Sequence, residues 1–354
     1  MHSDDANIWQ ASTTISAVCI SSIAAILAST WFWKKPGSKE CKPSLKPQKW
    51  VKVGNVKKLI VYPIKSCAGV VVEKAVVTTL GLKCHNANIR DRDFMVVDEN
   101  GRQVTMVKFP TMALIKMEVG EGDIITLSAP DMPSFTFTFP KPDGTNERVC
   151  RVKHDAHLKA LDCGDDVSQW FQEYIGDSTL RLYYHHLNFT QRTFEPYMFK
   201  CPQFERSDMG AFHNETSYLL VSEESIDELN KRLDKNSSWK NWRPTILIDQ
   251  VNEPFAEVNW SFVKIGRGNG ILKTAVPCYR CPLTTVDPDI GVLPKDGEPL
   301  KTLRTMNIGD EVVDKQLSEI LKSKGIMGLR LGLYLPAGEG SIINAGDPVY
   351  AALL

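Results

Sequence analysis

One segment decides the fold class: Phe262–Val276, which reads FVKIGRGNGILKTAV. Two runs rich in apolar and β-branched residues flank a short stretch that is mostly glycine. This pattern predicts two antiparallel strands joined by a hairpin turn. Glycine-rich loops also bind phosphate, but no helix follows here to supply the positive end of a helix dipole. We therefore expect a turn that delivers the chain to Pro277 and the loop beyond it.

Other parts of the chain carry strand signals as well. Leu59–Ile64 is an apolar run with β-branched residues, and Phe135–Phe139 alternates strictly between aromatic and hydroxyl side chains. Arg148–Lys153 follows a Pro-Asp-Gly turn and is predicted to be the hairpin partner of Phe135–Phe139. Two amphipathic helices are predicted, one capped by Asp165 and the other by Ser222. These patterns predict a β-rich α+β protein, barrel-like, with a few helices.

The overall charge excludes one class of partner. Among 354 residues, 42 are Lys or Arg and 42 are Asp or Glu, so no global field attracts nucleic acid and no nucleic-acid partner is expected. Any anionic ligand must be held by cations gathered locally. The nine cysteines are odd in number and lack the spacing of a disulfide scaffold, which favours a reducing compartment.

The N-terminal region differs from the rest. Residues 6–33 contain no charged side chain, and Lys34 and Lys35 follow at once. Within this stretch Ile15–Trp33 is mostly apolar, which is long enough to span a bilayer, for which about 20 residues are needed. We expect residues 1–35 to form a retained membrane signal-anchor, followed by a Lys- and Pro-rich tether over residues 36–50, with the body on the cytosolic side. A cleaved secretory signal and a targeting presequence are the alternatives.

The loop Cys278–Pro288 carries the candidate chemistry. It reads CYRCPLTTVDP, and the prolines in and beside it are expected to stop helix and central strand alike. An arginine beside a thiol favours the thiolate, which is the nucleophile and the metal ligand. The loop is compatible with a structural zinc site, a redox dithiol, a Cys–His nucleophile, a buried inert cysteine or one thiolate on a soft metal. Because no second Cys-x-x-Cys exists and no histidine lies in the loop, we favour the last.

Candidate groups for an anionic ligand lie where predicted strands and loops meet. They are Lys65 beside Ser66, Arg92, Arg243 and Arg280. Arginine forks suit phosphate, although each of these side chains alone is also typical of a solvated or salt-bridged surface. Asp91 and Asp93 could simply pair with Arg90 and Arg92 of the same loop.

Five motifs together resemble one family. They are Tyr62–Cys67, Arg90–Arg92, Asn241–Pro244, Arg280–Gly291 and Gly346–Tyr350. In this order they resemble the MOSC-domain family, and within it the mitochondrial amidoxime-reducing components. Single Lys-Ser or Arg-Pro pairs are unspecific, whereas the cysteine loop in company with the other motifs is specific. The resemblance covers the whole predicted body as well as the N-terminal anchor.

The resemblance implies an architecture and its division. A MOSC N-terminal β-barrel-like domain would occupy residues 51–190, and a MOSC domain of β-barrel type, carrying the cysteine loop, residues 191–354. Three positions depart from the family pattern. Asn214-Glu215 stands where Asp and a small residue are common, Thr245 where Asn is common, and Tyr279 where a small residue is common. These departures leave cofactor binding expected and make substrate preference the open point.

The resemblance also implies a molybdenum cofactor, Mo-molybdopterin, whose dithiolene and a cysteine thiolate bind an oxo-molybdenum centre. Such soft sulfur ligands suit this kind of metal. Cys281 matches the metal-ligating, catalytic cysteine, and Cys278 a frequent neighbour that does not ligate. The positions implied to hold the cofactor are Lys65, Ser66, Arg92, Thr216, Arg243, Tyr279, Arg280 and Cys281.

Activity, partners and location follow as expectations from the same resemblance. Family members reduce N-hydroxylated and N-oxygenated compounds such as amidoximes, hydroxylamines and N-oxides, with electrons from NADH through NADH-cytochrome b5 reductase and cytochrome b5. They sit on the mitochondrial outer membrane with the catalytic domain facing the cytosol. The resemblance therefore implies a molybdenum oxidoreductase. A molybdenum-cofactor carrier or sulfur-handling protein, and a membrane-tethered interaction module, are the alternatives.

Overall fold

The computed structural model describes residues 49–153, 156–189, 204–205, 208–268, 270–334 and 338–353. These residues belong to one compact unit, Pro47–Leu354. The predicted signal-anchor and nearly all of the predicted tether lie outside the described residues, as does the predicted division at residue 190. Within the part of the chain that the structure describes, no helix has the length and apolarity needed to cross a membrane.

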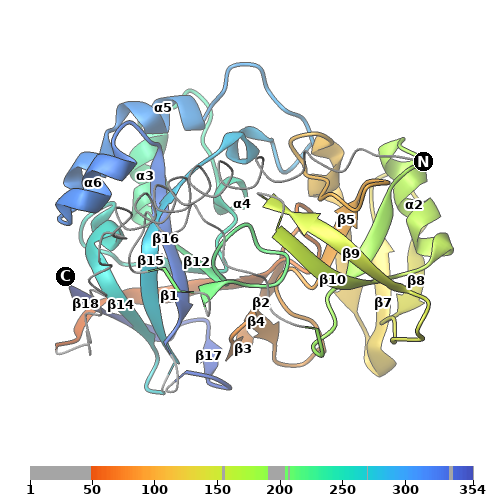
Figure 1. The fold of residues 1–354 in the computed structure, drawn as a ribbon. Coiled ribbons are helices and arrows are strands. Elements are labelled where there is room, and N and C mark those ends of the chain that lie inside the picture. The colour runs from red at the N-terminus through yellow and green to blue at the C-terminus, as the bar shows by residue number, and fades with distance from the viewer. Residues whose placement is uncertain are drawn as a thin grey trace, which may run out of the picture. The chain divides into compact units, whose positions relative to one another are not determined.

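A closed β-barrel is the main feature of this unit (Figure 1). In order around the barrel its strands are β13 (Ile246–Asp249), β12 (Tyr218–Ser222), β16 (Ile326–Leu333), β15 (Gly270–Tyr279), β14 (Trp260–Ile265), β18 (Pro348–Leu353) and β1 (Val51–Val61). The pairing of β1 with β13 closes the ring, and β2 (Val70–Val72) extends the sheet beside β1. Neighbouring strands are antiparallel except for β12 and β13, which are parallel. The predicted β-rich fold of barrel type is confirmed.

The hairpin predicted around the glycine-rich stretch is confirmed, because β14 and β15 pair antiparallel with Val263 opposite Leu272. The expectation that proline would end the strand is wrong at Pro277, which lies inside β15. Pairing with β14 stops at Lys273, so this end of β15 has only β16 as a neighbour. Register shifts on both sides of Pro277 mark bulges, and proline is tolerated at a bulge or a free strand edge.

Three smaller sheets complete the unit. One contains β5 (Phe94–Val97), β11 (Arg181–Tyr184), β10 (Ala156–Asp162) and β9 (Glu147–Val152); the second β6 (Lys116–Val119), β7 (Ile124–Ser128) and β8 (Phe135–Thr138); the third β17 (Ile342–Asn344), β3 (Lys74–Thr78) and β4 (Gly81–Cys84). The alternation that predicted a half-buried strand is confirmed in β8, whose phenylalanines are more buried than its threonines. Phe137 packs on Phe94 with 6.2 Å between ring centroids, and Phe94 on Tyr184 with 4.9 Å.

The predicted pairing of Arg148–Lys153 with Phe135–Phe139 is wrong. β8 pairs with β7, while β9 pairs along its whole length with β10, the strand that follows it directly. Cys150 and Leu158 face each other across this pair, and both are buried in the same small core. Closing a short connection costs less entropy than closing a longer one, so the pair closest in sequence forms when its apolar faces also match.

The helices are short and lie between strands. They are α2 (Asp165–Ile175), α3 (Glu223–Asn230), α4 (Trp239–Trp242), α5 (Leu300–Thr305) and α6 (Lys315–Leu321), with 3-10 turns η1 (Pro110–Leu114), η2 (Glu121–Asp123), η6 (Ala256–Asn259), η7 (Pro282–Thr285) and η8 (Ile308–Glu311). Ser222 caps α3 as predicted, with its hydroxyl accepting from the Ser225 amide. The cap predicted at Asp165 is wrong by one position, because Gly164 is the N-cap of α2 and Asp165 lies in its first turn.

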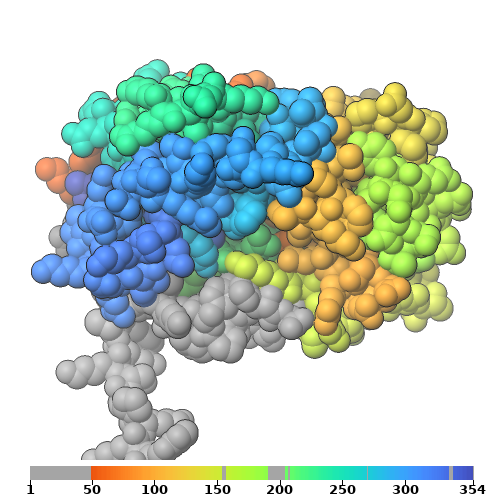
Figure 2. Space-filling model, turned by 90° about the horizontal axis from the view of Figure 1, so that it is seen from above, coloured from red at the N-terminus to blue at the C-terminus, as the bar shows by residue number. Residues whose placement is uncertain are grey.

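The early and late parts of the described chain interleave. β1 completes a barrel whose other strands all follow residue 217, and β17 pairs with β3. In Figure 2 the early part, orange to yellow-green, and the later part, green to blue, lie directly against each other. The segment after β1 therefore lies against the segment before β12. Lys65 of the first donates from its ammonium group to the Phe212 carbonyl of the second at 2.6 Å.

Two glycines with the same positive φ test the barrel packing. Gly328 in β16 has φ +79°, and a Cβ there would come within 2.2 Å of the Leu220 carbonyl oxygen. Gly340 has the same φ, but nothing lies within 4 Å of its Cβ position. We expect Gly340→Ala to lower the free energy of unfolding by about 1 kcal/mol through backbone conformation alone. Gly328→Ala should cost at least about 2 kcal/mol more, because β12 must also move. Urea unfolding measures both, and equal losses would contradict the packing.

Candidate functional site

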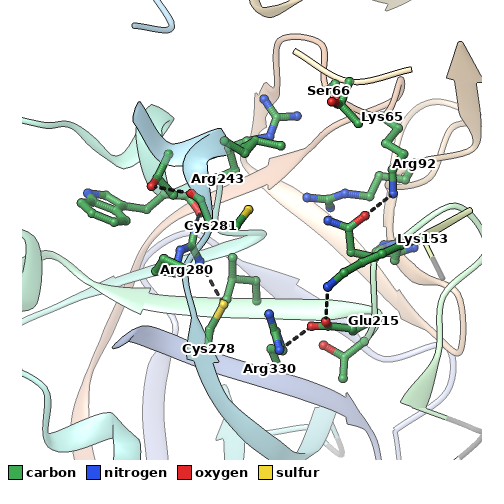
Figure 3. Close-up of a pocket in the computed structure, with 18 of the residues that line it drawn as sticks. Lys65, Ser66, Arg92, Lys153, Glu215, Arg243, Cys278, Arg280, Cys281 and Arg330 are labelled. Carbon is green, nitrogen blue, oxygen red and sulfur yellow. Dashed lines mark hydrogen bonds and ion pairs between the residues drawn. The ribbon is translucent and has the colours of Figure 1, made fainter. Parts of the chain in front are cut away.

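A cavity of about 310 Å³ lies where segments far apart in the chain meet (Figure 3). Residues from six segments line it. These are the segment after β1, the loop before β5, the segment before β12, the end of α4, the cysteine loop and β16. The structure brings together every position that the sequence predicted to bind the cofactor, and all of them line this cavity: Lys65, Ser66, Arg92, Thr216, Arg243, Tyr279, Arg280 and Cys281.

The cavity is cationic although the chain as a whole is neutral. Among the described residues that line it, one is a carboxylate, Glu215, and six are cations: Lys65, Arg92, Lys153, Arg243, Arg280 and Arg330. His213 adds no charge at neutral pH, because burial lowers its pKa to about 4. A site with this balance favours an anionic occupant.

Three of the lining residues adopt a left-handed backbone conformation that residues other than glycine normally avoid. Ser66 has φ +71°, Arg92 +57° and Arg243 +54°, and none of them is glycine. Such left-handed residues cost free energy and persist where the surrounding structure holds them, often at functional sites. Their gathering around one cavity sets it apart from a simple packing defect.

Two hydrogen-bond donors in this wall lack a partner among the residues that the structure describes. The Ser66 hydroxyl and the Arg243 Nη2 are buried and make no hydrogen bond within the described residues. The Arg243 guanidinium stacks over the Tyr62 ring at 4.2 Å, and Arg92 approaches the same ring at 5.1 Å. Burial lowers the pKa of Arg243 to about 10, so the group remains charged at neutral pH. Unpaired buried donors beside a cavity are suited to an oxygen-rich ligand.

A buried carboxylate orients Arg92. Asp91 is 1% exposed; its Oδ1 accepts from the Tyr62 amide at 2.8 Å, and its Oδ2 pairs with Arg92 and with His213 Nε2, the latter at 2.8 Å. Burial alone would raise the pKa of Asp91, but Arg92 and His213 outweigh it and hold the pKa below its ordinary value. Asp91 is therefore an anion that fixes the guanidinium at the cavity edge.

The cysteine loop presents one thiol to solvent. Cys281 is exposed, while the other cysteines that the structure describes are buried or half-buried. Cys281 is the N-cap residue directly before η7, and the Thr284 hydroxyl donates back to its carbonyl at 3.0 Å. The Asn241 side chain donates to the carbonyls of Thr284 at 3.2 Å and Val286 at 3.3 Å, so α4 braces the loop.

The first cysteine of the loop, Cys278, contacts an arginine. Arg280 Nη1 donates to the Cys278 sulfur at 3.1 Å, and its Nη2 donates to the Trp242 carbonyl (Figure 3). Cys278 is buried at the cavity wall. No group of three or more His, Cys, Asp or Glu side chains able to hold a metal occurs among the described residues, so the zinc alternative gains no ligand set there.

Sequence reasoning missed one cluster at this site. Lys153 and Arg330 line the cavity and both pair with Glu215, which the sequence singled out only as a departure from a family pattern. Arg330 carried a usable signal, since it is the one charged residue in the apolar strand β16. A charge buried in such a strand requires a partner. The partner itself, 115 positions earlier in the chain, could not be read from the sequence.

Comparison with known proteins agrees with these motifs. Residues 53–178 match the MOSC N-terminal beta barrel domain and residues 208–350 match the MOSC domain. The mitochondrial amidoxime-reducing component 1 of Xenopus laevis is 32% identical over 94% of this chain and 90% of its own length. The chain belongs to the MOSC-domain family. Component 1 of Homo sapiens is 34% identical over 84% of this chain and 83% of its own, and human component 2 is 29% identical over 93% and 90%.

Removing the charge of Asp91 tests its role in this MOSC protein. Asp91→Asn leaves Arg92 without its buried counter-charge, and we expect the free energy of unfolding to fall by about 3 kcal/mol. The control is Asp289→Asn, which breaks a largely exposed pair with Lys240 and should cost less than about 1 kcal/mol. Urea unfolding at pH 7 compares the two, and a loss at Asp91 no larger than that at Asp289 would refute the assignment.

His213 predicts a pH dependence of stability. Its folded pKa of about 4 lies below the ordinary value of 6.5, so the unfolded chain takes up a proton first as the pH falls. Stability contributed by neutral His213 is present above pH 6.5 and is lost between 6.5 and about 4. In His213→Gln, the slope of unfolding free energy against pH in this window should decrease by up to about 1.4 kcal/mol per pH unit. Parallel curves for the two proteins would contradict a neutral buried imidazole.

Proposed function

We propose that this protein is a molybdenum-cofactor-dependent reductase of N-hydroxylated and N-oxygenated compounds, such as amidoximes, hydroxylamines and N-oxides. One observation carries the proposal: an exposed thiol, Cys281, stands at a cavity lined by six cations. A thiolate is a ligand for a soft metal, and local cations suit a phosphate-bearing cofactor in a chain with no net charge. The names of the amidoxime-reducing relatives support the same reaction class.

The residues present fit the implied cofactor. Ser66 Oγ and Arg243 Nη2 are buried without a partner among the described residues, and both line the cavity. In the proposed site Cys281 ligates the metal, and the pterin and its phosphate are held by Lys65, Ser66, Arg92, Thr216, Arg243, Tyr279 and Arg280. When bound, the cofactor supplies the two-electron chemistry that removes oxygen from nitrogen.

The chain's own groups prepare this site for its ligand. Asp91 fixes the guanidinium of Arg92, and the guanidinium of Arg243 stacks over the Tyr62 ring. The Trp242 carbonyl and the Cys278 sulfur orient Arg280. Donors that are held before the ligand arrives need little reorganisation when it binds, which favours tight retention of the cofactor.

Electron donors and location belong to the same proposal. We infer that electrons come from NADH through NADH-cytochrome b5 reductase and cytochrome b5, and that an N-terminal anchor holds the protein on the mitochondrial outer membrane with the catalytic part in the cytosol. The relatives named above are called mitochondrial, which supports this location. The uncharged stretch 6–33, which is mostly apolar from Ile15 to Trp33, supports the anchor.

Metal content and turnover test the proposal together. The full chain, produced in a host that makes the cofactor, should carry close to one molybdenum and one pterin per chain. It should also reduce benzamidoxime when NADH, NADH-cytochrome b5 reductase and cytochrome b5 are supplied. Cys281→Ala should lose turnover to the background rate, because the metal loses its protein ligand. Cys163→Ala, at a cysteine outside the cavity, should retain both metal and turnover.

Two results would contradict the proposed reductase activity. A parent chain without metal and pterin would remove the cofactor from the proposal. A parent that carries both but reduces no N-hydroxylated compound would instead favour a cofactor carrier or sulfur-handling protein.

A further inference from the structure

A second cavity, of about 760 Å³, adjoins the proposed cofactor cavity. Among the described residues, Arg243 is the one that lines both cavities. The other walls come from the segment leading into β2, from η1 and β6, from the end of β7, and from α4 and the loop after η7. These segments belong to both matched domains, and the volume is typical of cavities that bind small molecules.

Most of the wall of this second cavity is apolar. Apolar and aromatic side chains make up most of the described lining, among them Val70, Val71, Leu114, Met117, Ala129 and Trp239. Val71 is 44% exposed, so part of this apolar surface is in contact with water. A ligand with an apolar body would remove such surface from water, which is favourable.

The charged residues of the second cavity differ in their burial. Lys240 and Asp289 pair with each other at the surface. Lys116 and Glu118 are both exposed and opposite in charge. Arg243, in contrast, is only 6% exposed. The buried charge in this wall is therefore positive, and the group that suits it best is an anion.

Two buried donors of this wall have no partner within the part of the chain that the structure describes. They are the Tyr62 hydroxyl and Arg243 Nη2, and the Arg243 guanidinium stacks over the Tyr62 ring at 4.2 Å. Tyr62 is 1% exposed, and burial raises the pKa of its hydroxyl, so this group keeps its proton and can donate at neutral pH. An unpaired buried donor costs free energy, and a ligand oxygen would relieve that cost.

The Tyr62 hydroxyl is separate from the groups assigned to the cofactor, because Tyr62 lines the second cavity and not the first. Arg243 can serve both cavities. A guanidinium carries five N–H donors in a flat fork, and a phosphate held in bidentate fashion occupies two of them. The second cavity therefore has a donor of its own and shares one cation with its neighbour.

We infer that this second cavity binds a small carboxylic acid with an apolar body. The carboxylate accepts hydrogen bonds from the Tyr62 hydroxyl and the Arg243 guanidinium, and the body lies along the apolar wall. A carboxylate suits this pair because it offers two oxygens to two donors and compensates the buried charge. This is a second ligand site, and it does not depend on the proposed reductase activity.

Calorimetry with octanoate tests the site on the full-length chain, purified from a host that makes the cofactor. Octanamide is the matched probe, because it has the same apolar body and nearly the same shape but no charge. We expect octanoate to bind at least about tenfold more tightly than octanamide, the size expected for charge-assisted hydrogen bonds. No binding of octanoate, or equal binding of the two compounds, would overturn the inference.

Tyr62→Phe removes the hydroxyl alone. Octanoate should bind about fivefold more weakly to this variant, because one hydrogen bond is lost. Without ligand, its urea unfolding midpoint should be equal to that of the parent or higher, since the hydroxyl has no partner to lose. Tyr350→Phe, in β18 and outside this cavity, is the control and should bind octanoate like the parent. Unchanged octanoate affinity in Tyr62→Phe, or a clearly lower midpoint, would contradict the assignment of this hydroxyl.

Ala129→Phe shows where the acid binds. Ala129 lines the second cavity and not the first, so a large side chain there fills the proposed site and lies outside the cofactor cavity. Octanoate affinity should fall at least about tenfold, while the urea unfolding midpoint stays close to that of the parent. If the variant is folded and binds octanoate as the parent does, the acid binds elsewhere and the inference fails.

Discussion

A single buried carboxylate, Asp91, joins the segments from which the site is built. Through its two oxygens it holds the Tyr62 amide at the end of β1, the guanidinium of Arg92 and the imidazole of His213 before β12. These groups come from parts of the chain up to 151 positions apart. An unpaired buried charge is very costly, so the buried Asp91 carboxylate is stable only while Tyr62, Arg92 and His213 stay in place around it. The barrel closes next to this junction, because β1 pairs with β13.

The site concentrates charge that the chain as a whole does not have. Equal numbers of acidic and basic residues give no overall field, yet six cations surround one cavity. Their mutual repulsion is relieved by a few buried partners, chiefly Asp91 and Glu215, and by stacking on the Tyr62 and Tyr279 rings. Among the described residues that line the cavity, cations still outnumber carboxylates, and this balance is the physical basis for proposing that the cavity binds an anionic group.

Local patterns predicted the elements well where the decisive contacts are local. The β14–β15 hairpin follows from its glycines, the cap of α3 from Ser222, and the buried face of β8 from alternation. Prediction failed where a neighbouring strand decided the outcome. β9 pairs with β10 instead of β8, and β15 continues through Pro277 because one of its edges is free there. Both outcomes depend on which strand is available as a partner, which no local pattern contains.

The sequence by itself determined the β-rich fold class, the cysteine loop and the set of candidate side chains, because periodicity, turn residues and motif order are properties of the linear chain. Only the tertiary structure decided that Lys65, Arg92, Arg243 and Arg280 converge on one cavity. It also decided that Glu215 is enclosed by Lys153 and Arg330. The reason is that burial and charge pairing arise between residues distant in sequence, and a side chain's protonation and partner depend on that three-dimensional surrounding.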